Sequence, residues 1–131
     1  MNAALSIRHG GLHTTVQDRG RYGLQAIGVP VSGALDAVAL HVANVLVGNA
    51  PGCAALEILG TGPVLEVNAE SVRLAIAGAN ASLEVLAPNR RALSCFESFR
   101  LQRGEIFRVG ALSDGAVTYL AVEGGLALPM L

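Results

Sequence analysis

Apolar residues alternate with polar ones, or follow one another for several positions, along most of the chain after Ala54. Glycine, proline or asparagine separates these segments, which is typical of short β-strands joined by turns. We therefore predict a mainly β protein, in the form of a barrel or a sandwich. The predicted strands are ALEIL, PVLEV, VRLAIAG, SLEVL and AVTYLAVEGG, with two more on either side of the turn Arg103-Gly104 in SCFESFRLQRGEIFRVG.

The part of the chain before Ala54 predicts two short strands and one prominent α-helix. ALSIRHGG is typical of a strand that ends in a glycine turn, and HTTVQD of a second strand because its threonines and valine are β-branched. Apolar residues recur at helical spacing between Asp36 and Val47. Asp36, or Ser32 before it, can cap this helix by accepting backbone N–H bonds. The segment GNAPG after it predicts a turn.

Composition favours one folded domain over residues 1–131. Hydrophobic residues make up 52% of the chain and charged residues 15%, the reverse of what disorder requires. The net charge of −1 gives no electrostatic reason to expect nucleic acid or a membrane as a partner. No apolar stretch reaches the ~20 residues of a membrane helix, and no signal peptide is recognisable. We therefore expect a cytoplasmic protein.

The basic residues are all arginine: the sequence has nine of them and no lysine. The chain therefore cannot carry biotin on a lysine, form a lysine Schiff base or hold phosphates with a P-loop lysine. If biotin takes part in the reaction, another chain carries it. If ATP takes part, another chain supplies many of the contacts that bind its phosphates.

Few residues of this chain suggest a metal or a thiol site. Cys53 and Cys95 are far apart in sequence, which favours buried structural thiols in a reducing compartment. Glu57 and Glu66 alternate with apolar neighbours, so we expect both to face solvent. The histidines are scattered, and without a cluster of ligands we predict surface or capping roles and no metal site. They are His9, His13 and His41.

One early segment, TTVQDRGRYG, gathers polar side chains between glycines. Asp18 and Arg19 can form a surface ion pair worth at most ~1 kcal/mol, with the glycines allowing a tight turn. Alternatively, the arginines bind a carboxylate or phosphate while Gln17 binds an amide. Gly33 lets backbone N–H groups approach a ligand, and the positive end of the helix near Asp36 faces the same way. The residue chemistry leaves both interpretations open.

Several motifs together resemble a known family. TTVQDRGRYG, GVPVSGALD, ALHVANVLVGN, ALEI, AIAGAN and YLAVEGG occur in this order. They resemble the second subunit of allophanate-hydrolase-like or Kip-type proteins. This biotin-dependent carboxyltransferase-like family includes part of the urea carboxylase carboxyltransferase domain and the C subunit of 5-oxoprolinase. The resemblance covers nearly the whole chain. Leu35 and His41 depart from it, where the family more often has Met and Arg.

The resemblance implies a cyclophilin-like β-barrel, here partial, with one prominent helix. Family members continue well beyond YLAVEGG. Residues 1–131 are therefore expected to be the N-terminal part of a longer domain, truncated within it, and inactive alone. The apolar residues of the last segment, GGLALPML, agree with this expectation because they lack polar cover.

The resemblance also implies a function. The leading hypothesis is a subunit of an ATP-dependent 5-oxoprolinase-type amide hydrolase, which opens 5-oxoproline to glutamate. Its expected partners are a related-fold subunit 1 (Kip-type inhibitor-like, the B subunit of 5-oxoprolinase), a protein similar to the A subunit of that enzyme, and a small amide substrate. One alternative is a biotin-dependent carboxyltransferase component that acts on urea-like substrates. Another is a non-enzymatic, Kip-type regulator of a histidine kinase.

The motifs that match the family give the candidate substrate-binding residues. We assign Arg19 to a carboxylate or carboxyphosphate-like anion and Gln17 to an amide, and we predict that TTVQDRGRYG and GVPVSGALD line one pocket. Asp36 can instead cap the helix, and Asn44 can hydrogen-bond a loop as readily as a ligand. No catalytic residue is assigned. The candidates are Gln17, Asp18, Arg19, Tyr22, Ser32, Gly33, Asp36 and Asn44.

Overall fold

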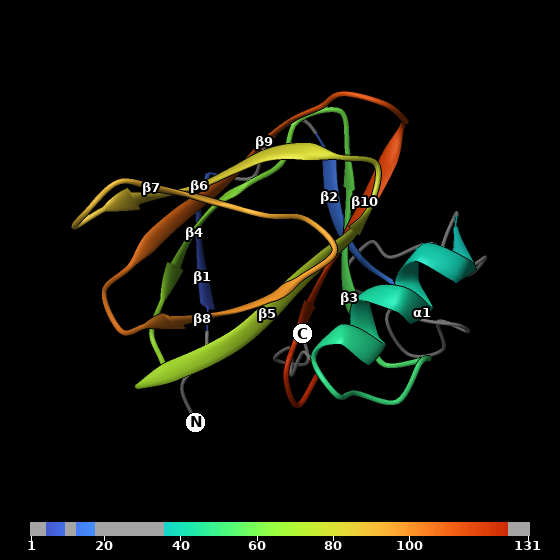
Figure 1. Cartoon of the computed structure of the whole chain (residues 1–131), viewed down its shortest axis with the longest axis horizontal. Helices are drawn as coiled ribbons and strands as arrows, with labels where there is room; N and C mark the ends of the chain where they lie inside the picture. The colour runs from blue at the N-terminus through green and yellow to red at the C-terminus, as the bar shows by residue number, and fades with distance from the viewer. Residues whose placement is uncertain (1–4, 10–12, 18–35, 126–131) are drawn as a thin grey trace.

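The computed structural model describes residues 5–9, 13–17 and 36–125, in which two antiparallel five-stranded sheets pack face to face (Figure 1). The first sheet has the order β1 (Leu5–His9), β4 (Val64–Val67), β9 (Ile106–Leu112), β6 (Ala81–Ala87) and β7 (Arg91–Leu93). The second has the order β2 (His13–Gln17), β3 (Ala55–Leu59), β10 (Val117–Val122), β5 (Ser71–Gly78) and β8 (Ser98–Gln102). The single helix of the described residues, α1, spans Ala37–Leu46.

The main core lies between the two sheets. Alternate residues of each strand point inward, as the two-residue period of a strand requires. Phe107 of β9 is fully buried there and meets Phe99 of β8 edge-on, with ring centroids 6.5 Å apart. Each sheet contributes aliphatic side chains to this core, among them Ile58, Leu74, Ile76 and Leu120 from one and Leu65, Val67, Leu83 and Val109 from the other.

A second, smaller core lies on the outer face of the second sheet, where α1 packs. Leu40 and Ala43 of the helix are fully buried against small residues of β3, β5 and β10. Alanines on these strands, such as Ala75 and Ala121, leave room for the helix to approach closely. Because β5 and β10 are covered on both faces, their sequences are near-continuous apolar runs rather than alternating ones.

The described structure confirms the mainly β fold with one helix and all of the predicted strands. It adds β7, a three-residue strand that has no apolar pattern by which it could be recognised. Neither sheet closes on itself among the described strands, so of the two architectures expected these residues form the sandwich. The cyclophilin-like description stays a prediction. At ten residues, α1 is too short to cross a membrane, and no other helix occurs in the described ranges.

Candidate functional site

A buried polar cluster lies where α1 meets the second sheet. Tyr119 of β10 stands opposite Glu57 of β3, and its hydroxyl donates to Glu57 Oε2 at 2.6 Å. The same hydroxyl accepts the backbone N–H of Asp36 at 2.9 Å. Asp36 in turn caps the helix, because its Oδ1 accepts the N–H of Ala39 at 3.0 Å. The start of α1 is thus attached to two central strands.

Burial changes the acidity of Tyr119 in this cluster. Tyr119 is fully buried and Glu57 is 3% exposed. Burial raises the pKa of Tyr119 well above the usual value for a phenol, and the hydrogen bond to Glu57 raises that pKa further. The phenol therefore stays protonated at neutral pH and remains a hydrogen-bond donor to Glu57 Oε2.

The position of Glu57 corrects the expectation that it faces solvent. Glu57 lies between Thr15 of β2 and Tyr119 of β10, in a strand that is hydrogen-bonded on both sides. It is on the same face of β3 as Ala55, which packs in the smaller core under α1. Glu66 is different: it is partly exposed and pairs with Arg8 at 2.7 Å. Alternation along a strand gave no signal that could distinguish the two glutamates.

Most of the predicted substrate-binding residues lie outside the described residues: Asp18, Arg19, Tyr22, Ser32 and Gly33. Gln17 ends β2, opposite Ala55 of β3, and its backbone alone is described. The described residues on either side of this segment come to neighbouring positions, because β2 pairs with β3 and Asp36 binds Tyr119. The shared pocket of TTVQDRGRYG and GVPVSGALD stays a prediction. The described residues that border this segment, β2 before it and Asp36 after it, lie next to the Glu57–Tyr119 pair.

Asn44 binds the loop that follows the helix. Its buried amide donates to the carbonyls of Pro51 at 3.0 Å and Cys53 at 2.8 Å, and its Oδ1 accepts from Asn49 at 3.3 Å. Asn49 extends the network by donating to the carbonyl of Val122 at 2.8 Å. The structure thus gives Asn44 and Asp36 the loop-binding and capping roles that the sequence allowed. A substrate contact for either residue stays a prediction.

The described cysteines and histidine contribute no reactive cluster. Cys53 and Cys95 are both free thiols, but they are partly buried rather than fully buried as the sequence predicted. Within residues 5–9, 13–17 and 36–125, no group of three potential metal ligands comes together. His41 of α1 is partly buried and lines an apolar pocket with Val42, Val45 and Leu46, and its Nε2 is buried with no hydrogen-bond partner among the described residues.

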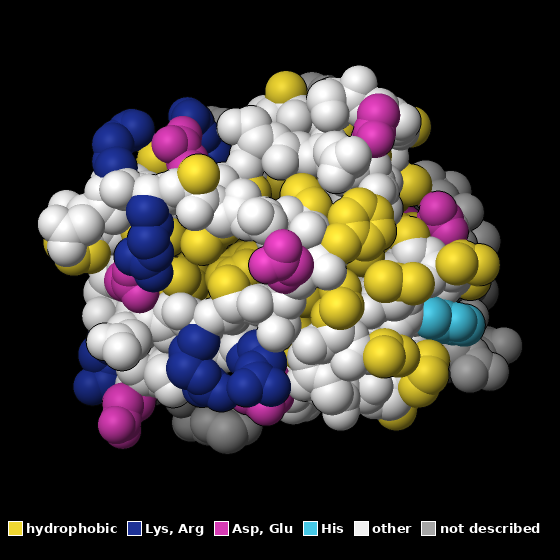
Figure 2. Space-filling view, viewed as in Figure 1, with side chains coloured by type: hydrophobic (Ala, Val, Ile, Leu, Met, Phe, Trp, Pro, Cys, Tyr) yellow, Lys and Arg dark blue, Asp and Glu magenta, His cyan; other side chains and the backbone are white. Residues whose placement is uncertain are grey.

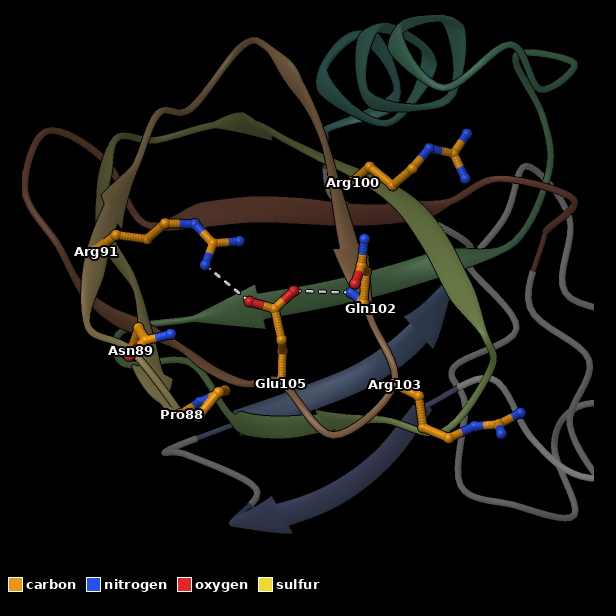
Figure 3. Close-up of a pocket in the computed structure, with 7 residues that line it drawn as sticks. All are labelled: Pro88, Asn89, Arg91, Arg100, Gln102, Arg103 and Glu105. Atoms are coloured by element: carbon orange, nitrogen blue, oxygen red, sulfur yellow. Dashed lines mark hydrogen bonds and ion pairs between the residues drawn. The ribbon is translucent and has the colours of Figure 1, made fainter.

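A polar cleft of about 390 Å³ lies between β7 and β8, where the sequence gave no indication of a site (Figure 3). Arg91 and Glu105 face each other across it at 2.8 Å, and the N–H of Gln102 donates to Glu105 at 2.8 Å. Although burial opposes ionisation, these two hydrogen bonds lower the pKa of Glu105. The cleft is lined by Pro88, Asn89, Arg91, Arg100, Gln102, Arg103 and Glu105.

Comparison with known proteins assigns the chain to a family. Residues 27–131 match the family model described as carboxyltransferase domain, subdomain A and B. The chain belongs to this carboxyltransferase family. The family assignment confirms the resemblance expected from the motifs, and this carboxyltransferase chain is similar to two groups of relatives.

The relatives are much longer than this carboxyltransferase chain. It is 36% identical over 128 residues to the C subunit of 5-oxoprolinase from Escherichia coli, which covers 95% of this chain and 39% of that protein. It is 35% identical over 127 residues to urea amidolyase of Lachancea kluyveri, covering 96% of this chain and 7% of that protein. The crystal structure of Kluyveromyces lactis urea carboxylase superposes with a TM-score of 0.82 at 36% identity, covering 97% of this chain and 11% of that one.

Proposed function

We propose that the chain works as a subunit, or as part of a subunit, of an ATP-dependent 5-oxoprolinase-type amide hydrolase that opens 5-oxoproline to glutamate. The observation that carries this proposal is the similarity to the C subunit of 5-oxoprolinase. It extends over 95% of this chain for the Escherichia coli protein and over 88% for that of Haemophilus influenzae. The chain spans 39% and 36% of these two proteins, so the activity of a whole protein is part of this proposal.

The described residues support a substrate site at the start of α1. The positive end of the helix dipole lies there, which favours an anionic group such as the carboxylate of 5-oxoproline. Tyr119 and Glu57 fix this end of the helix against β3 and β10. Arg19 and Gln17 are the residues that we propose for the carboxylate and the amide of the substrate.

Partner chains are part of this proposal. Two proteins complete the enzyme: a related-fold partner of the B type and a partner of the A type. Because the chain has no lysine, we assign most of the phosphate contacts of ATP to a partner chain. Biotin, if the assembly uses it, is attached to another chain.

Reconstitution tests the proposal. The chain is combined with its B-type and A-type partners, and glutamate release from 5-oxoproline is measured with and without ATP. We expect ATP-dependent release by the complete assembly and none by this chain alone. If a correctly assembled complex shows no ATP-dependent glutamate release, the proposed reaction is wrong. If the isolated chain releases glutamate, the proposal that partner chains are required is wrong.

Carboxyl transfer from biotin to a urea-like substrate is the second candidate function. It is favoured by the 36% identity to Kluyveromyces lactis urea carboxylase, whose structure superposes over 97% of this chain. The test supplies carboxybiotin on a separate carrier protein and measures its loss with and without urea. Urea-dependent loss, together with no glutamate release from 5-oxoproline, would favour transfer over hydrolysis.

A further inference from the structure

Two arginines stand side by side on the outer face of the second sheet. Arg73 of β5 and Arg100 of β8 are directly opposite each other in the antiparallel register. Both point outward, because their neighbours Leu74 and Leu101 are fully buried in the core. Figure 2 shows dark-blue side chains gathered over this part of β5 and β8, and all of them are arginines. Like charges in directly opposed positions repel each other.

Among the described residues, one ion pair involves these two arginines. Arg100 Nη2 lies 3.6 Å from Glu123 Oε1, and both side chains are about half exposed, at 46% and 47%. Arg100 Nη1 donates to the hydroxyl of Ser71 at 3.0 Å, which adds no charge. In the described part of the chain, Arg73 forms no ion pair. The Arg100–Glu123 ion pair is therefore a solvent-exposed surface salt bridge, a type that contributes little to stability.

A third arginine, Arg103, lies on the same side of the molecule, next to the exposed Glu70, whose carbonyl accepts the N–H of Arg103 at 3.1 Å. Arg103 Nε donates to the carbonyl of Asn68 at 3.0 Å, close to Ser71, which binds Arg100. Figure 3 shows that Arg100 and Arg103 both point away from the Arg91–Glu105 pair in the cleft. Their charges are therefore separate from that neutral pair, and both guanidinium groups lie beside the segment that joins β4 to β5.

We propose that Arg73 and Arg100 form a binding site for an oxyanion, the carboxylate or phosphate group of a small ligand. A guanidinium presents its N–H donors in a planar fork that matches either group, and two adjacent guanidiniums can bind it from both sides. The ligand would offset the repulsion between the two arginines. This site lies outside the segment to which we assign the 5-oxoproline carboxylate, so the inference goes beyond the proposed function.

Titration of the whole chain with inorganic phosphate, and separately with acetate, tests the site. Binding is followed by backbone amide chemical shifts at constant ionic strength. Arg90→Gln is the matched control, because Arg90 is exposed and also lies 3.6 Å from a carboxylate, that of Glu84. Losing one charge-assisted contact should weaken binding about tenfold in Arg73→Gln and Arg100→Gln, while Arg90→Gln binds like wild type.

The two anions identify the chemistry of the ligand. Tighter phosphate binding supports a phosphate ligand, and tighter acetate binding supports a carboxylate ligand. If neither anion gives saturable shifts at residues of β5 and β8, or if the three variants bind alike, the site does not exist.

Unfolding provides an independent measurement. A ligand that binds the folded state raises the unfolding midpoint. Phosphate should raise the midpoint of wild type and Arg90→Gln and leave that of Arg73→Gln nearly unchanged. Equal increases in all three proteins would place the anion elsewhere and overturn the proposal.

Discussion

The hydroxyl of Tyr119 lies 2.6 Å from a carboxylate oxygen of Glu57, in a part of the structure where both side chains are buried. The two residues are directly opposite each other on β10 and β3. Because the same hydroxyl accepts the N–H of Asp36, this pair also holds the first turn of α1. The contact therefore links the centre of the second sheet to the segment on which the proposed substrate site depends.

Tyr119→Phe should destabilise the fold. The substitution removes a hydrogen-bond donor from buried Glu57 and an acceptor from the N–H of Asp36. A lost hydrogen bond costs about 0.5–1.5 kcal/mol, so losing these two should lower the free energy of unfolding by about 1–3 kcal/mol. Urea denaturation at neutral pH measures the change. A variant as stable as wild type would mean that solvent replaces both hydrogen bonds.

The same tyrosine should make stability depend on alkaline pH. Burial raises the pKa of Tyr119 in the folded state above the value of about 10 found in unfolded chains. The folded protein then holds the proton at a pH where the unfolded chain has lost it. The stabilisation of the folded state by the protonated Tyr119 is fully present below about pH 10. It is lost as the pH rises toward the folded-state pKa.

Tyr119→Phe is the control for this pH dependence, because it lacks the titrating group. The stability difference between wild type and the variant should shrink between about pH 9 and about pH 11 in urea denaturation. The chain has no lysine, so few other groups titrate in this range. A constant difference across the range would contradict the raised pKa.

The glutamates show where sequence reasoning succeeds and where it ends. The sequence predicts both ALEIL and PVLEV as strands, because short apolar runs bounded by glycine and proline are typical of strands. Their glutamates have the same local pattern, yet Glu57 is buried and Glu66 pairs with Arg8 at the surface. The difference comes from tertiary placement, since Glu57 shares a face with the small core under α1.

The helix motif predicts local structure but not contacts between residues that are far apart in the sequence. Its spacing predicts α1 and its cap, which depend on residues close in sequence. The partners of Asn44 lie across a turn, and the charge pair of Arg73 and Arg100 depends on the register of β5 and β8. No hairpin turn joins β5 to β8, which are separated by β6 and β7 in the sequence, so turn geometry could not reveal their register.

Asn44→Ala should be strongly destabilising. Its fully buried amide satisfies the carbonyls of Pro51 and Cys53 and accepts from Asn49. These three hydrogen bonds are part-buried, and losing all of them should lower the free energy of unfolding by at least about 2 kcal/mol. Val45→Ala is the matched control on the same helix, since Val45 is 61% exposed and should change stability by no more than about 0.5 kcal/mol. Similar losses in both variants would show that the hydrogen-bond network does not account for the effect, because alanine raises helix propensity at both positions.

Thr118→Val should stabilise the protein. Thr118 is fully buried, and its hydroxyl finds no hydrogen-bond partner in the described structure. Valine has nearly the same shape as threonine and removes the desolvation cost of a buried, unpaired hydroxyl. We therefore expect the free energy of unfolding to rise by about 1 kcal/mol. Thermal and urea unfolding measure it. Destabilisation would reveal a hydrogen bond of Thr118 with a group beyond the described residues.

Substitutions of Asp36 separate capping from ligand binding. Asp36→Ala removes the acceptor for the N–H of Ala39 and should cost about 1 kcal/mol, whereas Asp36→Asn keeps a good cap and should cost little. Equal stability of the alanine variant and wild type would contradict the capping role. The asparagine variant then tests the substrate contact that the family resemblance implies, since it keeps the cap but loses the charge. A lower kcat/KM of the reconstituted assembly with this variant, at unchanged stability, would show that the carboxylate contacts the substrate. An unchanged kcat/KM would confine Asp36 to holding the start of α1, and the anion would then depend on Arg19 and the helix N-terminus.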